Sequence, residues 1–253
     1  MLFDTHAHYD DERFDEDRGS LLGKMLSNGV GLIVDPASDI ASAKKAQGIA
    51  RAFDFVYFAA GVHPHEAGSA SESYLEDIRA LAADPKCVAV GEIGLDYHYD
   101  FSPRDVQRRV FAQQLELSVE LGLPVIIHER EAVQDNLDIL RAHSGAHGVV
   151  HCYSGSWETA KLLLDMGYYL GFTGVVTFKN ARRVLEVVEK MPLERMVIET
   201  DSPYMAPVPH RGERNSSLLV HLVAERIAEI RGMSAEDVAR VTLENGKRLF
   251  NLS

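Results

Sequence analysis

The stretch ELGLPVIIH, residues 120–128, joins the end of a helix to a strand and then to a polar side chain. Gly122 suits the left-handed position that follows a helix, and the β-branched run PVII (124–127) predicts a strand. His128 comes directly after that strand. Two other helical patterns, ending in LSNG (26–29) and DMG (165–167), also stop at a glycine just before an apolar run. The sequence therefore predicts strands that alternate with helices.

Eight short apolar runs are separated by longer helix-like segments. They are LFDTH (2–6), GLIV (31–34), FVYFA (55–59), VAV (88–90), PVII (124–127), GVV (148–150), YYLGF (168–172) and MVI (196–198). This alternation favours parallel strands joined by crossovers, and eight units predict an α/β fold of the (β/α)8 TIM-barrel type. A doubly wound sheet is the alternative. No linker or low-complexity segment divides residues 1–253, so we expect one barrel domain.

Composition narrows the class of protein. A hydrophobic content of 46% over 253 residues is enough for a globular core, and no apolar run is long enough to span a membrane. The acidic start does not resemble a signal peptide, so we expect a cytoplasmic protein. Cys87 and Cys152 are too few for a disulfide framework or a cysteine-rich metal site and are expected to be buried, reduced thiols.

The net charge of −12 is opposite in sign to that of proteins that bind long duplexes. A phosphate-bearing substrate would need local positive charge, which bound divalent cations could supply.

Histidines and carboxylates follow most of the predicted strands, at the end where a barrel carries its functional groups. His6 and His8 stand two residues apart, so an extended chain would place both rings on one face. A carboxylate that follows a buried strand is costly unless it is paired or bound to a metal. The full set predicted to bind metal is His6, His8, Glu92, His128, His151 and Asp201.

These six ligands exceed what a single tetrahedral ion requires, so two divalent cations are expected. Glu92 has two oxygens and can bridge them. His6, His8 and Asp201 are assigned to one ion, and His128 and His151 to the other. The mixture of imidazole and carboxylate suits Zn²⁺, Mn²⁺ or Fe²⁺, with Mg²⁺ as a further possibility.

Seven sequence blocks resemble, in order and over nearly the whole chain, those of the TatD family of metal-dependent hydrolases. They are FDTHAH (3–8), GVHPH (61–65), VGEIGLDYH (90–98), PVIIH (124–128), HCYSG (151–155), IETDSPY (198–204) and ENGKRLF (244–250). The resemblance implies a TIM barrel with a two-metal centre at the six positions above. It also implies phosphodiester hydrolysis, as a deoxyribonuclease acting on single-stranded DNA or DNA ends. No protein partner is evident.

The chain departs from the family pattern at two places. HER (128–130) stands where the family usually has His-Ser-Arg, and RGERNSS (211–217) replaces an RGKRNEP-like stretch. Glu129 and Glu213 are therefore expected to add acidity near the substrate groove, where Ser216 and Ser217 also differ from the family.

The catalytic hypothesis gives Asp201, Glu92 and His63 separate roles. A hydroxide held by the paired metals attacks phosphorus, Asp201 ligates and orients or accepts the proton, and Glu92 bridges. His63 is assigned to the scissile phosphate and His65 to support of the site. Arg130, Lys179 and Arg211 are candidates for further phosphate contacts.

Other chemistries were weighed against this one. An amidohydrolase or a D-aminoacyl-tRNA deacylase could use the same metals on a carbonyl group. Barrel amidohydrolases commonly place a carbamylated lysine after strand four, where this chain has Glu92. Ser154, beside Cys152 and His151, lacks a GxSxG elbow, which disfavours a covalent nucleophile. A metal-storing barrel without turnover is the remaining alternative.

Overall fold

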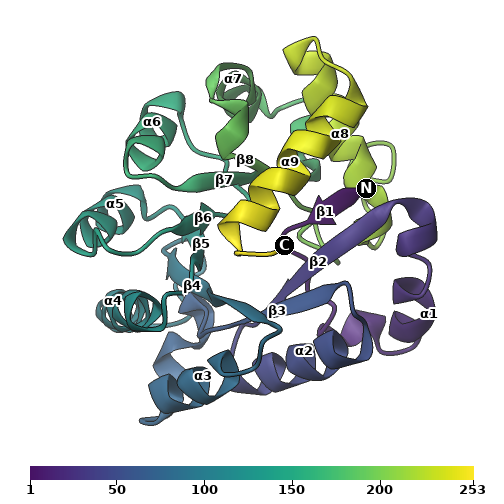
Figure 1. The fold of residues 1–253 in the computed structure, drawn as a ribbon. Coiled ribbons are helices and arrows are strands. Elements are labelled where there is room, and N and C mark those ends of the chain that lie inside the picture. The colour runs from purple at the N-terminus through teal and green to yellow at the C-terminus, as the bar shows by residue number, and fades with distance from the viewer.

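The computed structural model describes residues 1–253 as a ring of parallel strands surrounded by helices (Figure 1). The strands are β1 Leu2–Asp4, β2 Val30–Pro36, β3 Val56–Ala60, β4 Cys87–Asp96, β5 Val125–Arg130, β6 Gly148–Val150, β7 Tyr169–Phe172 and β8 Met196–Ile198. They lie in the order β1 to β8, and every neighbouring pair is parallel. The predicted TIM barrel is confirmed, and all eight predicted strands form.

Helices follow the strands and cover the outside of the ring. They are α1 Arg18–Leu22, α2 Ile40–Ala52, α3 Tyr74–Ala82, α4 Arg104–Leu121, α5 Val133–Ala142, α6 Trp157–Asp165, α7 Arg182–Lys190, α8 Val220–Arg231 and α9 Ala235–Leu249. Gly29, Gly122 and Gly167 have φ values of 82°, 66° and 89°. These are the left-handed positions predicted for them, and each sends the chain into the following strand.

The core has two layers because side chains alternate across each strand. One layer fills the barrel interior with small and branched residues such as Val34, Ala59, Ile126 and Val197. The other, larger layer packs the outer faces of the strands against the helices.

The last helix closes the amino end of the barrel. Phe250, which follows α9, packs against Phe3 of β1 with ring centroids 5.9 Å apart. Asn245 of α9 donates hydrogen bonds to the carbonyl oxygens of Leu193 and Met196, at the start of β8. In Figure 1, α9 crosses in front of the strands. The opposite, carboxyl end of the barrel is therefore the end left for functional groups.

The seam between β1 and β8 is closed just beyond the two strands. The Thr5 N–H donates to the Ile198 carbonyl, and the Asp201 N–H donates to the His6 carbonyl, at 3.2 and 2.9 Å. The His8 N–H donates to Ser202 at 2.7 Å, and Ala7 bridges Ser202. Residues nearly 200 positions apart thus share one short parallel ladder, which carries His6, His8 and Asp201.

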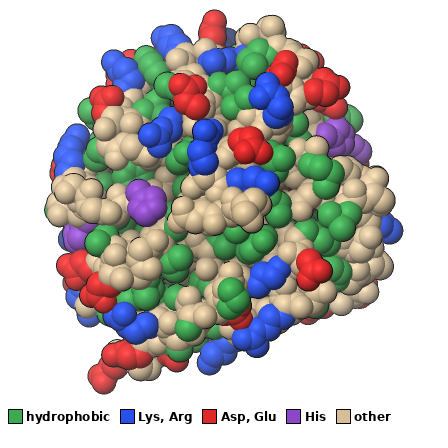
Figure 2. Space-filling view, in the orientation of Figure 1, with side chains coloured by type: hydrophobic (Ala, Val, Ile, Leu, Met, Phe, Trp, Pro, Cys, Tyr) green, Lys and Arg blue, Asp and Glu red, His purple; other side chains and the backbone are tan.

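The surface shown in Figure 2 carries Lys, Arg, Asp and Glu side chains of both signs close together. This face has no extended basic field of the kind that binds a long duplex. None of the helices combines the length and the apolar character that a membrane crossing requires.

Candidate metal centre

The first group of ligand atoms lies at the β1–β8 seam. His6 Nε2 and His8 Nε2 are 3.1 Å apart, although β1 ends before them, at Asp4. His6 Nε2 lies 3.3 Å from Glu92 Oε2, and Asp201 Oδ1 lies 3.5 Å from His8 Nε2 and 3.8 Å from His6 Nε2. Ligand atoms around a tetrahedral ion with bonds of about 2.0–2.1 Å are about 3.3 Å apart. These four side chains therefore fit one cation.

The second group lies across the barrel axis, at the ends of β5 and β6. Glu92 Oε1 is 2.9 Å from His128 Nδ1 and 2.8 Å from His151 Nε2, and these two nitrogens are 3.4 Å apart. Glu92 thus turns one oxygen to each group of histidines. The predicted ligands therefore gather around the two oxygens of Glu92.

Glu92 reaches this position because the strand pairing is irregular. The register between β4 and β5 shifts between Val90 and Ile93. Val90 and Ile93 both pack outward in the layer under the helices. The shift is what turns the intervening Glu92 into the barrel, since strict alternation from Val90 would have kept it on the outer face.

In each histidine ring, the hydrogen-bond partner of one nitrogen shows that the other nitrogen faces the candidate metal site. His8 Nδ1 lies 3.1 Å from the Pro36 carbonyl oxygen and donates to it, so Nε2 is the nitrogen that faces the candidate metal site. His128 is reversed, because its Nε2 donates to Asp96 Oδ2 at 3.1 Å and its Nδ1 faces Glu92. Both ring orientations are thereby fixed, with Nε2 of His8 and Nδ1 of His128 directed at the site.

The carboxylates remain anionic. Burial would raise the pKa of Glu92, but the surrounding histidines, His151 first among them, outweigh burial and lower that pKa well below its usual value. The pKa of Asp201 is also lowered, since the hydrogen bond from His8 and the nearby histidine charges outweigh burial. Both side chains are therefore acceptors ready to ligate a cation at neutral pH.

Two buried carboxylates contact histidines of the candidate metal site. The sequence interpretation missed both of them. Asp96 Oδ2 accepts from both His65 Nε2, at 2.8 Å, and His128 Nε2. Glu199 Oε1 accepts from the Cys152 N–H and lies 3.6 Å from His151 Nδ1. Asp96 could have been found, because it stands four residues after Glu92 and so shares its face of the strand.

Comparison with known proteins gives the family. The family described as TatD related DNase matches residues 3–251. The chain belongs to the TatD family. It is 44% identical to the Bacillus subtilis (strain 168) uncharacterized metal-dependent hydrolase YabD, over 100% of both chains. It is 33% identical, again over 100% of both, to an Escherichia fergusonii protein named 3′-5′ ssDNA/RNA exonuclease TatD.

The fold comparison agrees. The crystal structure of YjjV, a TatD homologue from Escherichia coli K12, superimposes with a TM-score of 0.93 at 31% identity. That match covers 100% of this chain and 98% of the other. The predicted resemblance to the TatD family is confirmed, and this chain is a metal-dependent hydrolase of that family.

His63, assigned from the sequence to the scissile phosphate, lies beside the candidate metal ligands. Its Nε2 is 3.4 Å from Glu92 Oε1, so it borders the second group of ligands. Its Nδ1 accepts a hydrogen bond from the His65 N–H, which places the ring proton on Nε2. Burial lowers the pKa of His63 to about 4, so the ring is neutral. His63 therefore presents an N–H donor to the site.

The candidate cationic contacts lie farther out. The Arg130 guanidinium sits 4.7 Å from the Tyr99 ring centroid, and that of Arg211 sits 4.1 Å from the Phe178 ring centroid. Lys179 is exposed in the loop after β7. None of the three forms an ion pair with a carboxylate of the chain, so their charges are available to a ligand.

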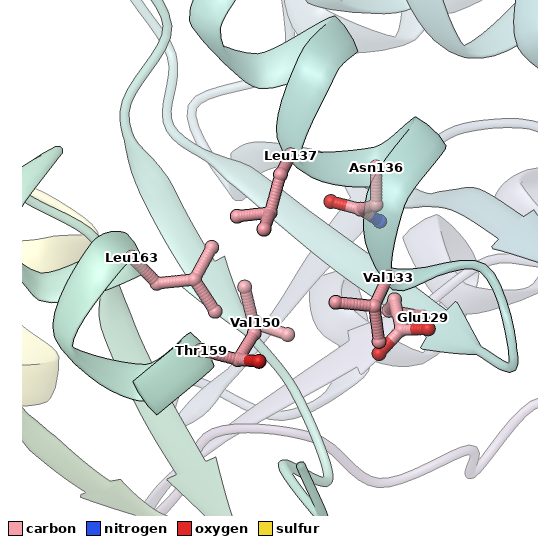
Figure 3. A pocket seen from close by; sticks show the side chains of 7 residues that line it. All are labelled: Glu129, Val133, Asn136, Leu137, Val150, Thr159 and Leu163. Carbon is pink, nitrogen blue, oxygen red and sulfur yellow. The ribbon is translucent and has the colours of Figure 1, made fainter. Parts of the chain in front are cut away.

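Glu129 does not add acidity to the groove, so that expectation is wrong. It follows His128 on β5 and points to the opposite face, where it lines a small pocket between α5 and α6 (Figure 3). Its Oε1 accepts from the Ala132 N–H at 2.8 Å, and burial raises the pKa of Glu129.

In the second departure from the TatD pattern, RGERNSS (211–217), Ser217 and Glu213 contact other residues of the chain. Ser217 is buried and donates to Asp4 Oδ2, while Tyr9 donates to Ser217 Oγ at 3.1 Å. Glu213 pairs with His210 at 3.0 Å in the exposed loop after β8. Ser217 therefore braces the base of the β1–β8 seam and does not face a substrate.

A cysteine or serine nucleophile finds no support in the geometry. Burial raises the pKa of the Cys152 thiol to about 12, so the thiolate is scarce. Cys152 Sγ contacts Thr173 Oγ1 at 3.6 Å. Cys87 is buried as expected, whereas Cys152 is only partly buried. Ser154 is exposed and forms no hydrogen bond with a histidine.

Proposed function

We propose that this TatD-family hydrolase cleaves phosphodiester bonds in DNA, at or near strand ends, with two divalent cations per chain. The division of the Glu92 oxygens between two groups of histidines carries this proposal, because one carboxylate oxygen is then available to each of two cations. A relative that is 33% identical over its full length and is named as a single-strand exonuclease supports the choice of substrate.

The bound cation pair would ionise a water molecule, bind phosphate oxygens and stabilise the leaving oxygen. His6, His8 and Asp201 would hold one cation, and His128 and His151 would hold the other. The second oxygen of Asp201 is free to orient or accept the proton of the attacking water. The His63 Nε2–H is placed to donate to an oxygen of the scissile phosphate.

Arg130, Arg211 and Lys179 are assigned to phosphates beyond the scissile one. Arg130 ends β5, and Lys179 and Arg211 lie in the loops after β7 and β8, all toward the carboxyl end of the barrel. Their positions and their freedom from ion pairs support this role. His65 is assigned an indirect role, because it donates to Asp96, which orients His128.

Carbonyl hydrolysis is the competing function, and one panel of substrates separates the two. Purified protein loaded with Zn²⁺, Mn²⁺ or Mg²⁺ is offered short single-stranded oligonucleotides, a small phosphodiester, amide substrates and D-aminoacyl-tRNA. We expect shortened oligonucleotides and cleaved phosphodiester. Release of free amino acid or amine, without any cleavage of phosphodiesters, would assign the site to a deacylase or amidohydrolase.

A further inference from the structure

Two exposed aromatic side chains stand next to the metal centre. Tyr99 and Phe101, in the loop that follows β4, are 48% and 68% exposed. Their rings stack on each other with centroids 5.3 Å apart and planes 22° apart. A single exposed aromatic residue needs no explanation, but a stacked pair beside a hydrolytic site does.

The pair connects directly to the centre through His65. The His65 ring makes edge contacts with Tyr99 and Phe101, at centroid distances of 5.4 and 4.9 Å. On its other side, His65 contacts the ring of His63, at 4.3 Å. One imidazole therefore separates the exposed pair from the donor that faces the scissile phosphate.

The loop is held in place before any ligand arrives. The N–H groups of His98 and Tyr99 donate to Asp96 Oδ1 at 2.9 and 2.8 Å. Ser102 donates to the His65 carbonyl at 2.8 Å, and Gln107 Nε2 donates to the Ser102 carbonyl at 2.8 Å. The exposed rings thus have a preformed position, which lowers the entropic cost of binding to them.

We propose that Tyr99 and Phe101 form a stacking platform for an unpaired nucleobase of the strand whose phosphate is held at the metal centre. Every nucleobase offers a π face, so such a platform tolerates any sequence. Arg130 covers part of Tyr99, and Phe101, the more exposed ring, offers the open face. This inference rests on the proposed phosphodiesterase function and adds to it a contact for the base beside the scissile phosphate.

The surrounding charges favour a base over a phosphate as the occupant. Arg104 pairs with Asp100 at 2.8 Å, and His98 pairs with Glu131 at 2.7 Å. Arg104 is therefore matched by a carboxylate, and the unpaired Arg130 lies over Tyr99, in a chain with a net charge of −12. Aromatic surface is what this region offers to a strand, and bases in a duplex are not available to it.

The test combines a change in the protein with a change in the substrate. A single abasic site is moved along a short single-stranded oligonucleotide, and kcat and KM are measured for the wild type and Phe101→Ala. At one position near the cleaved bond, we expect loss of the base to raise the wild-type KM about tenfold, within the range for stacking of one base on an aromatic side chain. Phe101→Ala should raise KM for the intact strand by a similar factor and be nearly insensitive to that abasic site.

Two further variants complete the design. Phe101→Trp should restore the low KM, because tryptophan keeps the π face. Leu26→Ala removes an apolar side chain that is 54% exposed, just before β2 at the amino end of the barrel, and should behave as the wild type. Metal content is measured for each variant, so that a disturbed centre is recognised separately.

The outcomes separate the two proposals. If the wild type cleaves oligonucleotides and Phe101→Ala responds to abasic sites as the wild type does, the platform is wrong and the phosphodiesterase function stands. If the wild type cleaves methyl p-nitrophenyl phosphate but no oligonucleotide, the platform is also wrong. If no phosphodiester is cleaved with any of the cations, the proposed function itself fails.

Discussion

His8 and His128 direct different ring nitrogens toward the metal centre, and the partner of the other nitrogen decides which. A backbone carbonyl, that of Pro36, holds the Nδ1 proton of His8. A carboxylate, that of Asp96, holds the Nε2 proton of His128. Such partners fix ring orientation and raise ligand basicity, and their loss typically lowers metal affinity about 10- to 100-fold. At this scale, the site depends on Asp96 and Pro36 as well as on the ligands.

Replacing Asp201 with Asn should reduce hydrolysis by two or more orders of magnitude while the fold persists. The change keeps the shape of a side chain that lies 3.5 Å from His8 Nε2 but removes the charge that binds a cation and accepts a proton. Turnover under metal-replete conditions, together with circular dichroism, checks this. Asp138→Asn, on the exposed face of α5, is the matched control. Near-normal turnover of the Asp201 variant would remove it from the catalytic role.

Metal binding at neutral pH should release protons. The carboxylates beside His8, Asp201 first among them, outweigh burial and raise its pKa to about 10 in the metal-free protein. His8 is therefore protonated below that pH and must lose its proton before it can ligate, so affinity should rise with pH. Calorimetric titration with Zn²⁺ in two buffers of different ionisation enthalpy measures the number released. A value of zero at pH 7 would show that the rings are already neutral.

At the scale of elements, the candidate metal ligands and the helix that seals the barrel lie at opposite ends of the barrel. The ligands lie beyond or near the carboxyl ends of β1, β4, β5, β6 and β8, whereas α9 seals the amino end. Helix ends on the amino side can therefore be weakened without moving a ligand.

Ser234→Ala should test this separation. The Ser234 hydroxyl oxygen caps α9 by accepting from the Asp237 N–H at 3.1 Å, and losing such a cap typically costs about 1 kcal/mol. We expect urea denaturation to show that loss in the free energy of unfolding, with normal metal content and turnover. Ser73 occupies the same position before α3 without a capping hydrogen bond, so Ser73→Ala should cost less. Equal costs for the two variants would contradict this account of the cap.

Across the whole molecule, the metal centre joins the two ends of the chain. His6 and His8 come from the start, Asp201 from the region after β8, and Glu92, His128 and His151 from between them. Cations held by this set would cross-link the strands at the seam that only a short ladder closes.

Removal of metal should therefore lower the thermal stability. A ligand at about 100 times its Kd stabilises the folded state by about 2.7 kcal/mol, which corresponds to roughly 5–10 °C for a domain of this size. Differential scanning calorimetry with and without EDTA measures the shift. Glu92→Gln should lose most of the shift, because that side chain serves both groups of histidines. An unchanged Tm after chelation, with metal loss verified, would show that the ions do not brace the barrel.

Much of the fold could be predicted from sequence because its determinants are local. Apolar runs that fit strands, and glycines that end helices, are properties of neighbouring residues. Gly122 before β5 is the clearest example, with its left-handed φ of 66°. The spacing of His6 and His8 likewise predicted that their rings share a face, and they do so even though β1 ends before them.

The sequence by itself determined the order of strands and helices and which side chains carry metal-binding chemistry. Only the tertiary structure decided which atoms meet. The register shift in β4 turned Glu92 inward, β5 turned Glu129 outward, and packing brought Asp96 and Glu199 against His128 and His151. Side-chain periodicity is set within one strand, whereas hydrogen-bond partners depend on the register of strands far apart in the chain.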